Sequence, residues 1–263
     1  TLSLDDPISR WIDLPYGNDV SIRMLLDHTS GIPSYTGDLR FLIRYFALPT
    51  KQWRPAELTD VLEGKPLRFS PGTRHEYSNS NYLLLGIILE SATGSSYSDL
   101  LSGLMEDGLN LYRTYYLAYP DYLPLANGYD RSVLRLGRRN LNAFRTSLET
   151  GAFAAGGILS TSSDTSLFVH SLFTGGVIGD SALTRMLTFI DAPDPDVPTQ
   201  SGYGLGVRRL EIDGNQWIGH TGTIPGYSGI AVYNRERSLA ITVLCNLSTI
   251  DQVEILQAIV NAM

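Results

Sequence analysis

The chain has little cysteine, little lysine and no long apolar run in its 263 residues. Its single cysteine, Cys245, cannot form a disulfide within the chain, so cysteine content neither supports nor excludes an oxidising compartment. No apolar stretch reaches the roughly 20 residues that a membrane-spanning helix needs. Lys51 and Lys65 are the only lysines, the arginines are scattered, and the formal net charge is -7. No basic stripe is therefore present for nucleic acid or an anionic membrane, and a small-molecule or peptide substrate fits the composition better.

The first residues, Thr1 to Asp6, lack the basic and then apolar layout of a secretory signal peptide. A threonine also stands where an initiating methionine would be. We therefore expect a chain whose start has been processed, cut or left incomplete.

The first 150 residues predict short helices joined by long loops. Ser21 can cap a helix that runs to Leu26, and Pro55 can begin one that runs to Gly64. The segment 82–89 is apolar on all sides, which is typical of a buried helix. Periodicity is weak over 104–150, where tyrosines are frequent, so we expect an irregular lobe with tyrosine rings packed inward.

Two helices are expected before the chain changes to a strand period. Ser162 or Ser163 can cap the first, and its apolar side is predicted to consist of Leu167, Phe168, Leu172 and Phe173. The second is expected over residues 180–189, and the prolines of 191–198 predict a loop after it.

The remaining sequence predicts strands that follow one another with short turns. Asp213-Gly214-Asn215 is a hairpin signal, because positive φ costs little at these residues. Expected strands are 203–212, 216–219, 227–234 and 239–246, followed by an amphipathic helix over 250–262 whose stripe is Val253, Leu256, Ile259 and Val260. Such strands form an antiparallel sheet with helices laid against it, which is an α+β fold. We divide the chain into a mostly helical and irregular lobe over 1–160 and a lobe of helix plus sheet over 161–263.

Two short motifs, Tyr77-Ser78-Asn79 and Gly219-His220-Thr221-Gly222, carry residues suited to acyl transfer. This reaction needs an activated nucleophile, a base that takes its proton, and donors aimed at the developing oxyanion. Tyr77 can act as the base only if nearby positive charge lowers its pKa well below about 10, and His220, or a lysine if one were supplied, is a suitable neighbour. Asn79 can orient a lysine or hydrogen-bond the amide of an acyl substrate.

The glycine of the second motif permits a ligand to approach the strand closely. The backbone N–H groups of Thr221, Gly222 and Thr223 are then available as an oxyanion donor and a substrate-pairing edge. Either motif alone is a weak signal, since Tyr-x-Asn occurs by chance and His-Thr-Gly can be a turn.

Other kinds of site find little support in the sequence. The four histidines show no metal-ligand spacing, because His75-Glu76 lacks the second histidine of a zinc motif, so we expect no metal and no cofactor. No Gly-x-Ser-x-Gly elbow is present, and residues 226–229, which come close, are better interpreted as the start of a strand. His28 is expected to be a structural hydrogen-bonding residue.

Five segments spread over nearly the whole chain resemble a known family. They are residues 25–33 (LLDHTSGIP), 69–82 (FSPGTRHEYSNSNY), 155–161 (AGGILST), 203–206 (YGLG) and 219–222 (GHTG). In this order they resemble successive blocks of the serine β-lactamase-related family, which includes class C β-lactamases, D-alanyl-D-alanine carboxypeptidases and β-lactamase-like esterases.

The resemblance implies a β-lactamase/transpeptidase-like body of sheet and helices beside a mostly helical lobe, with the site between them. It implies that Tyr77 is a base partner, that Asn79 contacts substrate and lysine, and that His220 replaces the lysine or histidine of the third motif. These three are the expected catalytic residues. Thr221, Gly222 and Thr223 are the expected substrate-binding residues, with the Thr223 N–H in the oxyanion hole. The resemblance also favours an exported location, periplasmic or at the cell surface.

One block of the family is absent from these residues. In the family a Ser-x-x-Lys stands on a helix just before the segment that resembles residues 2–6. Here Leu48 and Leu62 stand three positions before the two lysines, so the sequence contains no Ser-x-x-Lys. We expect the nucleophile and the first strands of the sheet to lie upstream of Thr1.

Two functions therefore stay open. One is a serine hydrolase that acts through an acyl-enzyme on an amide or ester, with its nucleophile upstream of this chain. The other is a catalytically inactive binding module or truncated relative that holds a peptide or cell-wall ligand.

Overall fold

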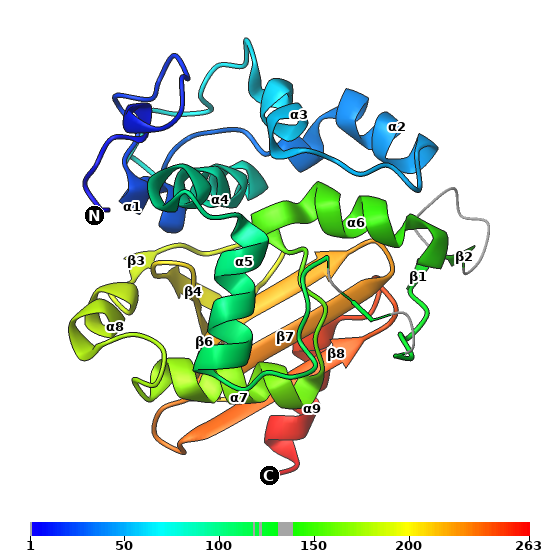
Figure 1. Cartoon of the computed structure of the whole chain (residues 1–263). Helices are drawn as coiled ribbons and strands as arrows, with labels where there is room; N and C mark the ends of the chain where they lie inside the picture. Colours follow the sequence, from blue (N-terminus) through cyan, green and yellow to red (C-terminus); the bar gives the residue numbers. More distant parts are fainter. Residues whose placement is uncertain (1, 118, 121–122, 131–138) are drawn as a thin grey trace. The chain divides into compact units, whose positions relative to one another are not determined.

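The computed structural model describes residues 2–117, 119–120, 123–130 and 139–263, which form two compact units (Figure 1). The N-terminal unit comprises Thr1–Leu101 and Ala143–Gly157, and the sheet unit comprises Ser102–Asn142 and Ile158–Met263. The predicted lobe over 1–160 differs from this division, because residues 102–142 and 158–160 group with the sheet. Residues 121–122 and 131–138 of the expected irregular segment lie outside the described residues.

The N-terminal unit is mostly helical in its described residues. Its helices are α1 (Ile22–Leu26), α2 (Leu39–Ala47), α3 (Pro55–Thr59), α4 (Asn79–Thr93), α5 (Tyr97–Ser102, ending at the first residue of the sheet unit) and α6 (Arg145–Ala152). Short 3-10 turns occur at Ile8–Arg10, Tyr35–Gly37, Asp60–Leu62 and Phe153–Ala155.

Two helix starts in this unit follow the predicted capping chemistry. The Ser21 hydroxyl accepts a hydrogen bond from the Met24 N–H at the start of α1. Pro55 occupies the first position of α3, where its missing N–H costs nothing. Both predicted helix starts are confirmed, although α3 gives way to the 3-10 turn Asp60–Leu62 before Gly64.

Helix α4 carries the first candidate motif at its N-terminus. Residues 82–88 are buried or half-buried as predicted, whereas Leu89 is 36% exposed. The helix ends at Gly94, which adopts the left-handed conformation with φ of 72°. A Cβ at Gly86 would lie 2.5 Å from the Phe153 ring, so this glycine lets the turn Phe153–Ala155 pack directly on the helix. That contact fixes one side of α4 within the unit.

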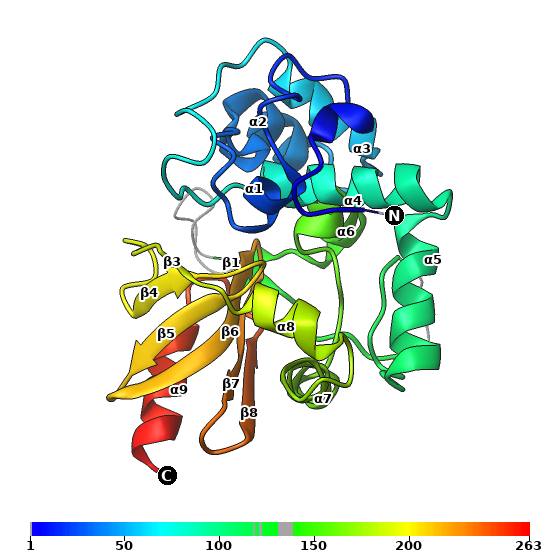
Figure 2. The same cartoon turned by 90° about the vertical axis from the view of Figure 1, so that its left-hand side faces the viewer.

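The sheet unit contains a six-stranded antiparallel sheet in the order β3-β4-β5-β6-β7-β8 (Figure 2). The strands are β3 (Ile190–Asp191), β4 (Gln200–Tyr203), β5 (Arg208–Ile212), β6 (Asn215–Ile224), β7 (Tyr227–Asn234) and β8 (Leu239–Cys245). Further elements are a π-helical turn (Gly103–Gly108), the pair β1 (Tyr129–Asp130) and β2 (Arg139–Asn140), α7 (Ser162–Phe173), α8 (Asp180–Met186) and α9 (Gln252–Asn261). A 3-10 turn (Asn142–Phe144) begins at the last residue before the chain returns to the N-terminal unit.

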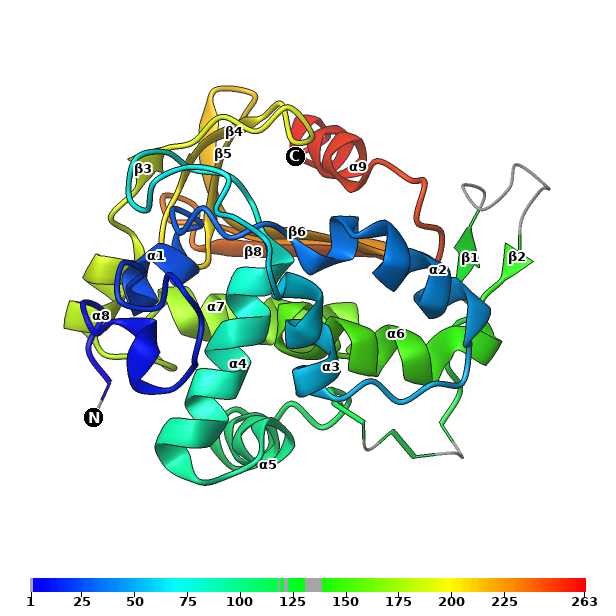
Figure 3. The same ribbon diagram turned by 90° about the horizontal axis from the view of Figure 1, so that it is seen from above.

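Helices α7 and α9 cover opposite faces of this sheet (Figure 3). On one face, Leu256 and Val260 of α9 pack with the fully buried Trp217. On the other face, Leu172 and Phe173 of α7 pack with residues of β6 and β7. Each face of the sheet therefore has its own apolar core, and the predicted α+β architecture is present.

Several predicted details of the helices differ from the structure. Thr161, not Ser162 or Ser163, caps α7 through its hydroxyl. Leu167 is 44% exposed, and Val169 takes its expected place in the core. Residues two apart lie on nearly opposite sides of an α-helix, and the sheet covers the side of α7 that carries Val169. Ile259 of α9 is also exposed, by 37%.

The predicted strand 203–212 is interrupted in the structure. Gly206 has φ of 84°, and a Cβ at Gly204 would lie 2.2 Å from the Met186 carbonyl oxygen. These glycines turn the chain between β4 and β5, which pair with each other. The predicted hairpin at 213–215 is confirmed, with Asp213 and Gly214 at φ of 51° and 70°.

Strand β8 lies at one end of the sheet order. Within the described ranges no strand pairs with its outer edge, and its seven residues carry no charge. Strand β8 is therefore an unpaired edge among the described strands. No helix of the described residues has both the length and the hydropathy needed to cross a bilayer.

Candidate functional site

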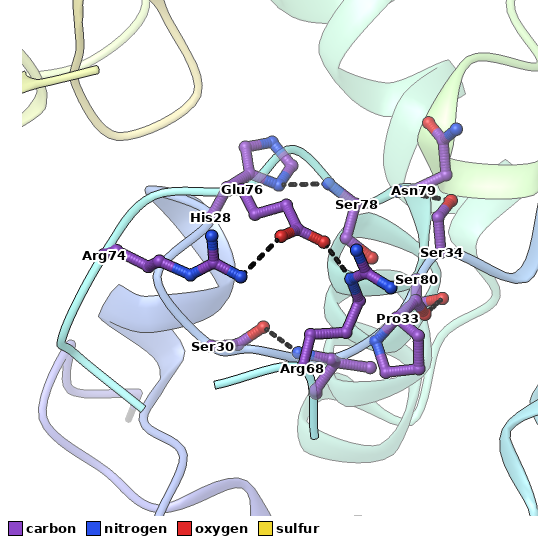
Figure 4. Close-up of polar contacts among 11 residues, drawn as sticks. His28, Ser30, Pro33, Ser34, Arg68, Arg74, Glu76, Ser78, Asn79 and Ser80 are labelled. Carbon is purple, nitrogen blue, oxygen red and sulfur yellow. Dashed lines mark hydrogen bonds and ion pairs between the residues drawn. The ribbon is translucent and has the colours of Figure 1, made fainter. Parts of the chain in front are cut away.

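The first candidate motif, Tyr77-Ser78-Asn79, stands where an extended segment enters α4 of the N-terminal unit. Ser78 is the N-cap residue, and its backbone N–H donates to Nδ1 of His28 at 3.1 Å (Figure 4). The half-buried Tyr77 ring lies against the His28 ring, with centroids 4.2 Å apart and planes inclined by 36°. The motif is thus held against the segment that follows α1.

His28 is the residue that holds this segment. It is fully buried and adopts φ of 58°. Its Nδ1 accepts from Ser78 and lies 3.0 Å from the amide nitrogen of Asn81, which is also a donor. Nδ1 therefore carries no proton, and the ring is in the Nε2–H form. The prediction that His28 has a structural hydrogen-bonding role is confirmed.

Asn79 is held by a second pair of contacts from the same unit. Its backbone N–H donates to Ser34 Oγ at 3.3 Å, and its Nδ2 donates to Thr36 Oγ1 at 2.9 Å. The two hydroxyls lie 2.8 Å from each other, so Ser34, Thr36 and Asn79 form one hydrogen-bonded group. The fixed amide presents Oδ1 as an acceptor for an ammonium or an N–H group.

The second candidate motif lies on β6 of the sheet unit, near the end of the strand. Strand β5 pairs with β6 only as far as Gly219, which is opposite Arg208. Strand β7 continues to pair with β6 up to Ile224. Residues 220–224 therefore have a strand partner on one side only within the described part of the chain. Gly222 and Thr223 are exposed, and a Cβ at Gly222 would meet nothing within 4 Å.

The imidazole of His220 contacts hydrogen-bonding partners at both ring nitrogens. Nδ1 lies 2.5 Å from the Thr221 carbonyl oxygen, and Nε2 lies 2.8 Å from the Tyr203 hydroxyl. The Tyr203 and His220 rings meet edge to face, with centroids 5.8 Å apart. Tyr203 itself is fully buried on β4.

Burial, together with the nearby Arg208 guanidinium, lowers the pKa of His220 to about 4. The hydrogen bond to the Thr221 carbonyl and the negative charge of Asp194 act in the opposite direction. His220 is therefore neutral at pH 7. The lowered pKa favours a neutral ring, so His220 does not supply at pH 7 the positive charge expected of it as a neighbour of Tyr77.

Acid is expected to destabilise the sheet unit through His220. An unfolded histidine has a pKa near 6.5, so between about pH 6.5 and 4 the unfolded state binds a proton that the folded state does not. This residue's contribution to the free energy of unfolding is full above pH 6.5 and falls as pH falls, by up to about 1.4 kcal/mol per pH unit. Urea unfolding of the wild type and His220→Gln from pH 7 to 4.5 measures it.

The stability difference between these two proteins should shrink as the pH is lowered. Asp38 and Glu57 do not interfere, since hydrogen bonds from Lys65 and Lys51 hold their pKa values at about 2. Their stabilising contributions begin to fall only below about pH 4.5. A difference that is constant over this range would contradict the lowered pKa of His220.

The described residues contain no group of three or more histidine, cysteine, aspartate or glutamate side chains that could hold a metal ion. The first motif belongs to the N-terminal unit and the second to the sheet unit, and the structure describes the surroundings of each one separately.

Sequence reasoning missed the side chains that surround His220. Tyr203 belongs to a segment that resembles the family, but the sequence predicts it inside a continuous strand over 203–212. Arg208 is 5% exposed and lies 2.8 Å from Asp194, and its guanidinium lies over the Tyr203 ring at 5.8 Å from the centroid. Gln200 accepts a hydrogen bond from the same arginine. Only the register of β4, β5 and β6 brings these residues together, and no spacing in the sequence indicates it.

Comparisons with known proteins support the fold and the family. The family model described as Beta-lactamase matches residues 1–261. A D-stereospecific amidohydrolase from Streptomyces sp. has a similar structure, with TM-score 0.83 and 29% identity over 94% of this chain and 75% of that chain. D-amino acid amidase from Ochrobactrum anthropi SV3, complexed with D-phenylalanine, gives TM-score 0.81 and 27% identity over 100% of this chain and 85% of that one.

Among curated proteins, a putative D-alanyl-D-alanine carboxypeptidase of Escherichia coli O157:H7 is 25% identical over 270 residues. The match covers 87% of this chain and 57% of that protein. The chain spans 25% to 57% of the length of the first curated relatives that it matches. The solved structures confirm the predicted β-lactamase/transpeptidase-like fold, and the match over residues 1–261 shows that the chain belongs to the Beta-lactamase family.

Proposed function

We propose that residues 1–263 are part of a serine hydrolase that transfers an acyl group through an acyl-enzyme. The substrate is a small amide or ester, of the kind offered by a lactam, a D-alanyl peptide or an amino acid amide. Tyr77, Asn79 and His220 are the proposed catalytic residues, and Thr221, Gly222 and Thr223 are the proposed substrate-binding residues. The nucleophile and its lysine come from a Ser-x-x-Lys outside these residues.

The observation that carries this proposal is the one-sided pairing of β6 over residues 220–224. An extended substrate can add to such an edge through backbone hydrogen bonds, and the open space at Gly222 allows it to approach. An N–H group on this edge that donates to the oxyanion is worth on the order of 100-fold to 1000-fold in rate. Membership of the Beta-lactamase family supports the same chemistry.

The first motif supplies the proton transfer in this proposal. The stacking on His28 and the Ser78 hydrogen bond restrain the position of Tyr77 before a substrate arrives. Since His220 is neutral, the positive charge that lowers the pKa of the phenol comes from the lysine of the Ser-x-x-Lys. Asn79 offers its fixed Oδ1 to that ammonium or to the amide N–H of the substrate.

The substrate class is supported by two of the similar structures. Both are named for amide hydrolysis of D-configured substrates, and one of them is described in complex with L-phenylalanine amide. We therefore place D-amino acid amides and D-alanyl peptides first among the substrates to test.

A binding module is the second candidate, because the 263 residues contain no Ser-x-x-Lys. In that case the same edge of β6 holds a peptide or cell-wall ligand without forming a covalent bond.

Covalent labelling separates these two functions. Residues 1–263 and the longer parent protein are each incubated with a fluorescent penicillin and with a short-chain nitrophenyl ester, and adducts are detected by intact mass. We expect an adduct and a burst of nitrophenol with the parent protein and neither with residues 1–263. An adduct on residues 1–263 would contradict the external nucleophile. A parent protein inert to both, and to D-alanyl dipeptides and D-amino acid amides, would leave the binding module.

A further inference from the structure

We propose that Tyr203 is a positioning residue that fixes His220 as the neutral Nδ1–H tautomer, and that this fixed ring holds the Thr221 carbonyl in place beside the exposed edge of β6. The tautomer is inferred from the contacts of the two ring nitrogens together with the neutral state of the ring. Only the purpose of the fixed ring rests on the proposed function.

The tautomer follows from what each partner is able to do. A backbone carbonyl only accepts hydrogen bonds, so the 2.5 Å contact with the Thr221 oxygen requires a proton on Nδ1 of His220. A neutral imidazole carries one ring proton, so Nε2 is then an acceptor. The Tyr203 hydroxyl, 2.8 Å away, is a donor for that acceptor. Tyrosine and carbonyl therefore select the same tautomer from opposite sides of the ring.

Tyr203 is itself held rigidly enough to act in this way. It has no exposed surface, and its backbone pairs with Ile190 of β3 on one side and Arg208 of β5 on the other. The Arg208 guanidinium lies over its ring, and Asp194 and Gln200 hold that guanidinium. The hydroxyl therefore reaches His220 from a fixed ring.

These contacts give His220 a positioning role in the site and not a role in proton transfer. Both ring nitrogens already have partners within the sheet unit. The Nδ1–H holds the carbonyl of Thr221, which directly precedes the exposed Gly222 and Thr223. The uncharged ring thereby fixes the position of the strand segment that is proposed to receive the substrate.

Nitrogen-15 NMR of the histidine rings tests the proposal without any substrate. In the wild type at pH 7, the His220 ring is expected to show a protonated Nδ1 and an unprotonated, hydrogen-bonded Nε2, with the signals assigned by their loss in His220→Gln. In Tyr203→Phe, the Nε2 signal is expected to move toward that of a nitrogen without a hydrogen bond. The pKa of His220 should also rise, because the lost bond favoured the neutral ring; Arg208 and Asp194 remain beside it in both proteins.

Tyr233→Phe is the matched control, since Tyr233 is a buried tyrosine on β7 whose ring stacks on Phe173. It should leave the His220 signals unchanged. A wild-type His220 with its proton on Nε2 would overturn the proposal even if Tyr203→Phe failed to fold, and so would a Tyr203→Phe spectrum identical to the wild type.

Activity of the parent protein provides a separate readout. Tyr203→Phe is expected to lower acylation by roughly tenfold, the scale of a modest misplacement of the binding edge. A parent protein with no activity at all would contradict the proposed function and leave the NMR result to decide the role of Tyr203. Full acylation by a folded Tyr203→Phe parent would contradict the positioning role.

Discussion

Tyr77→Phe is expected to lower acylation by the parent protein by at least roughly 100-fold, the scale of a lost general base. The phenol oxygen is the only atom removed. The ring contact with His28, at 4.2 Å between centroids, is retained by phenylalanine, as is the hydrogen bond from the Ser78 N–H to His28. The loss should therefore appear in the acylation rate constant and not in the stability. Stopped-flow acylation and urea unfolding of both proteins measure the two quantities.

Tyr82→Phe is the matched control for this substitution. Tyr82 also lies against His28, with centroids 5.3 Å apart, and its hydroxyl donates to the Leu26 carbonyl at 3.1 Å. Removing that hydroxyl should cost on the order of 1 kcal/mol of stability and change acylation by less than about threefold. A Tyr77→Phe protein that acylates within threefold of the wild type would remove Tyr77 from the mechanism, and equal losses in both variants would indicate a general disturbance of the loop.

The elements that could be predicted from the sequence are those whose signals are local. Ser21 and Pro55 begin helices because a cap and a first-turn proline act on their own neighbours. Strand β7 has the predicted bounds of 227–234, since a strand pattern is a property of consecutive residues in the sequence. The turn at Asp213 and Gly214 needs positive φ, and both residue types accept it.

The errors in the predicted fold occur where distant residues decide the outcome. The chain turns at Gly204, where the Met186 carbonyl oxygen leaves no room for a Cβ, and at Gly206, which has φ of 84°. The apolar residues Leu205 and Val207 hide that turn in the sequence. Similarly, Val169 and not Leu167 is buried, because the position of α7 on the sheet decides which side of the helix is covered.

In the candidate site, too, the motif residues could be predicted from the sequence and their contacts could not. Tyr77, Asn79 and His220 could be proposed from motifs and resemblance, because each motif is contiguous in the sequence. Their hydrogen-bond partners could not, since Thr36 and Tyr203 reach them across loops and strands. The neutral state of His220 was also hidden, because burial and not sequence sets its pKa.

Gly219→Ala is expected to destabilise the protein by at least about 3 kcal/mol, at the upper end of overpacking effects. An added Cβ would lie 2.0 Å from the Ala231 carbonyl oxygen and 2.7 Å from the Val232 Cα, both in the backbone of the paired strand β7. Neither atom can move without separating β6 from β7 next to His220. The urea midpoint should fall without a change in slope, which measures the loss directly.

Gly222→Ala, on the same strand, is expected to leave the stability unchanged and to lower the acylation rate. Its Cβ would meet nothing within 4 Å, so the stability should change by less than about 0.5 kcal/mol. The same methyl group would stand on the edge proposed to receive the substrate, so acylation by the parent protein should fall roughly tenfold to 100-fold. If Gly222→Ala acylated normally, the substrate would not pass along this edge. If it unfolded as readily as Gly219→Ala, the glycines of the motif would serve the fold and the open edge of β6 would lose its proposed function.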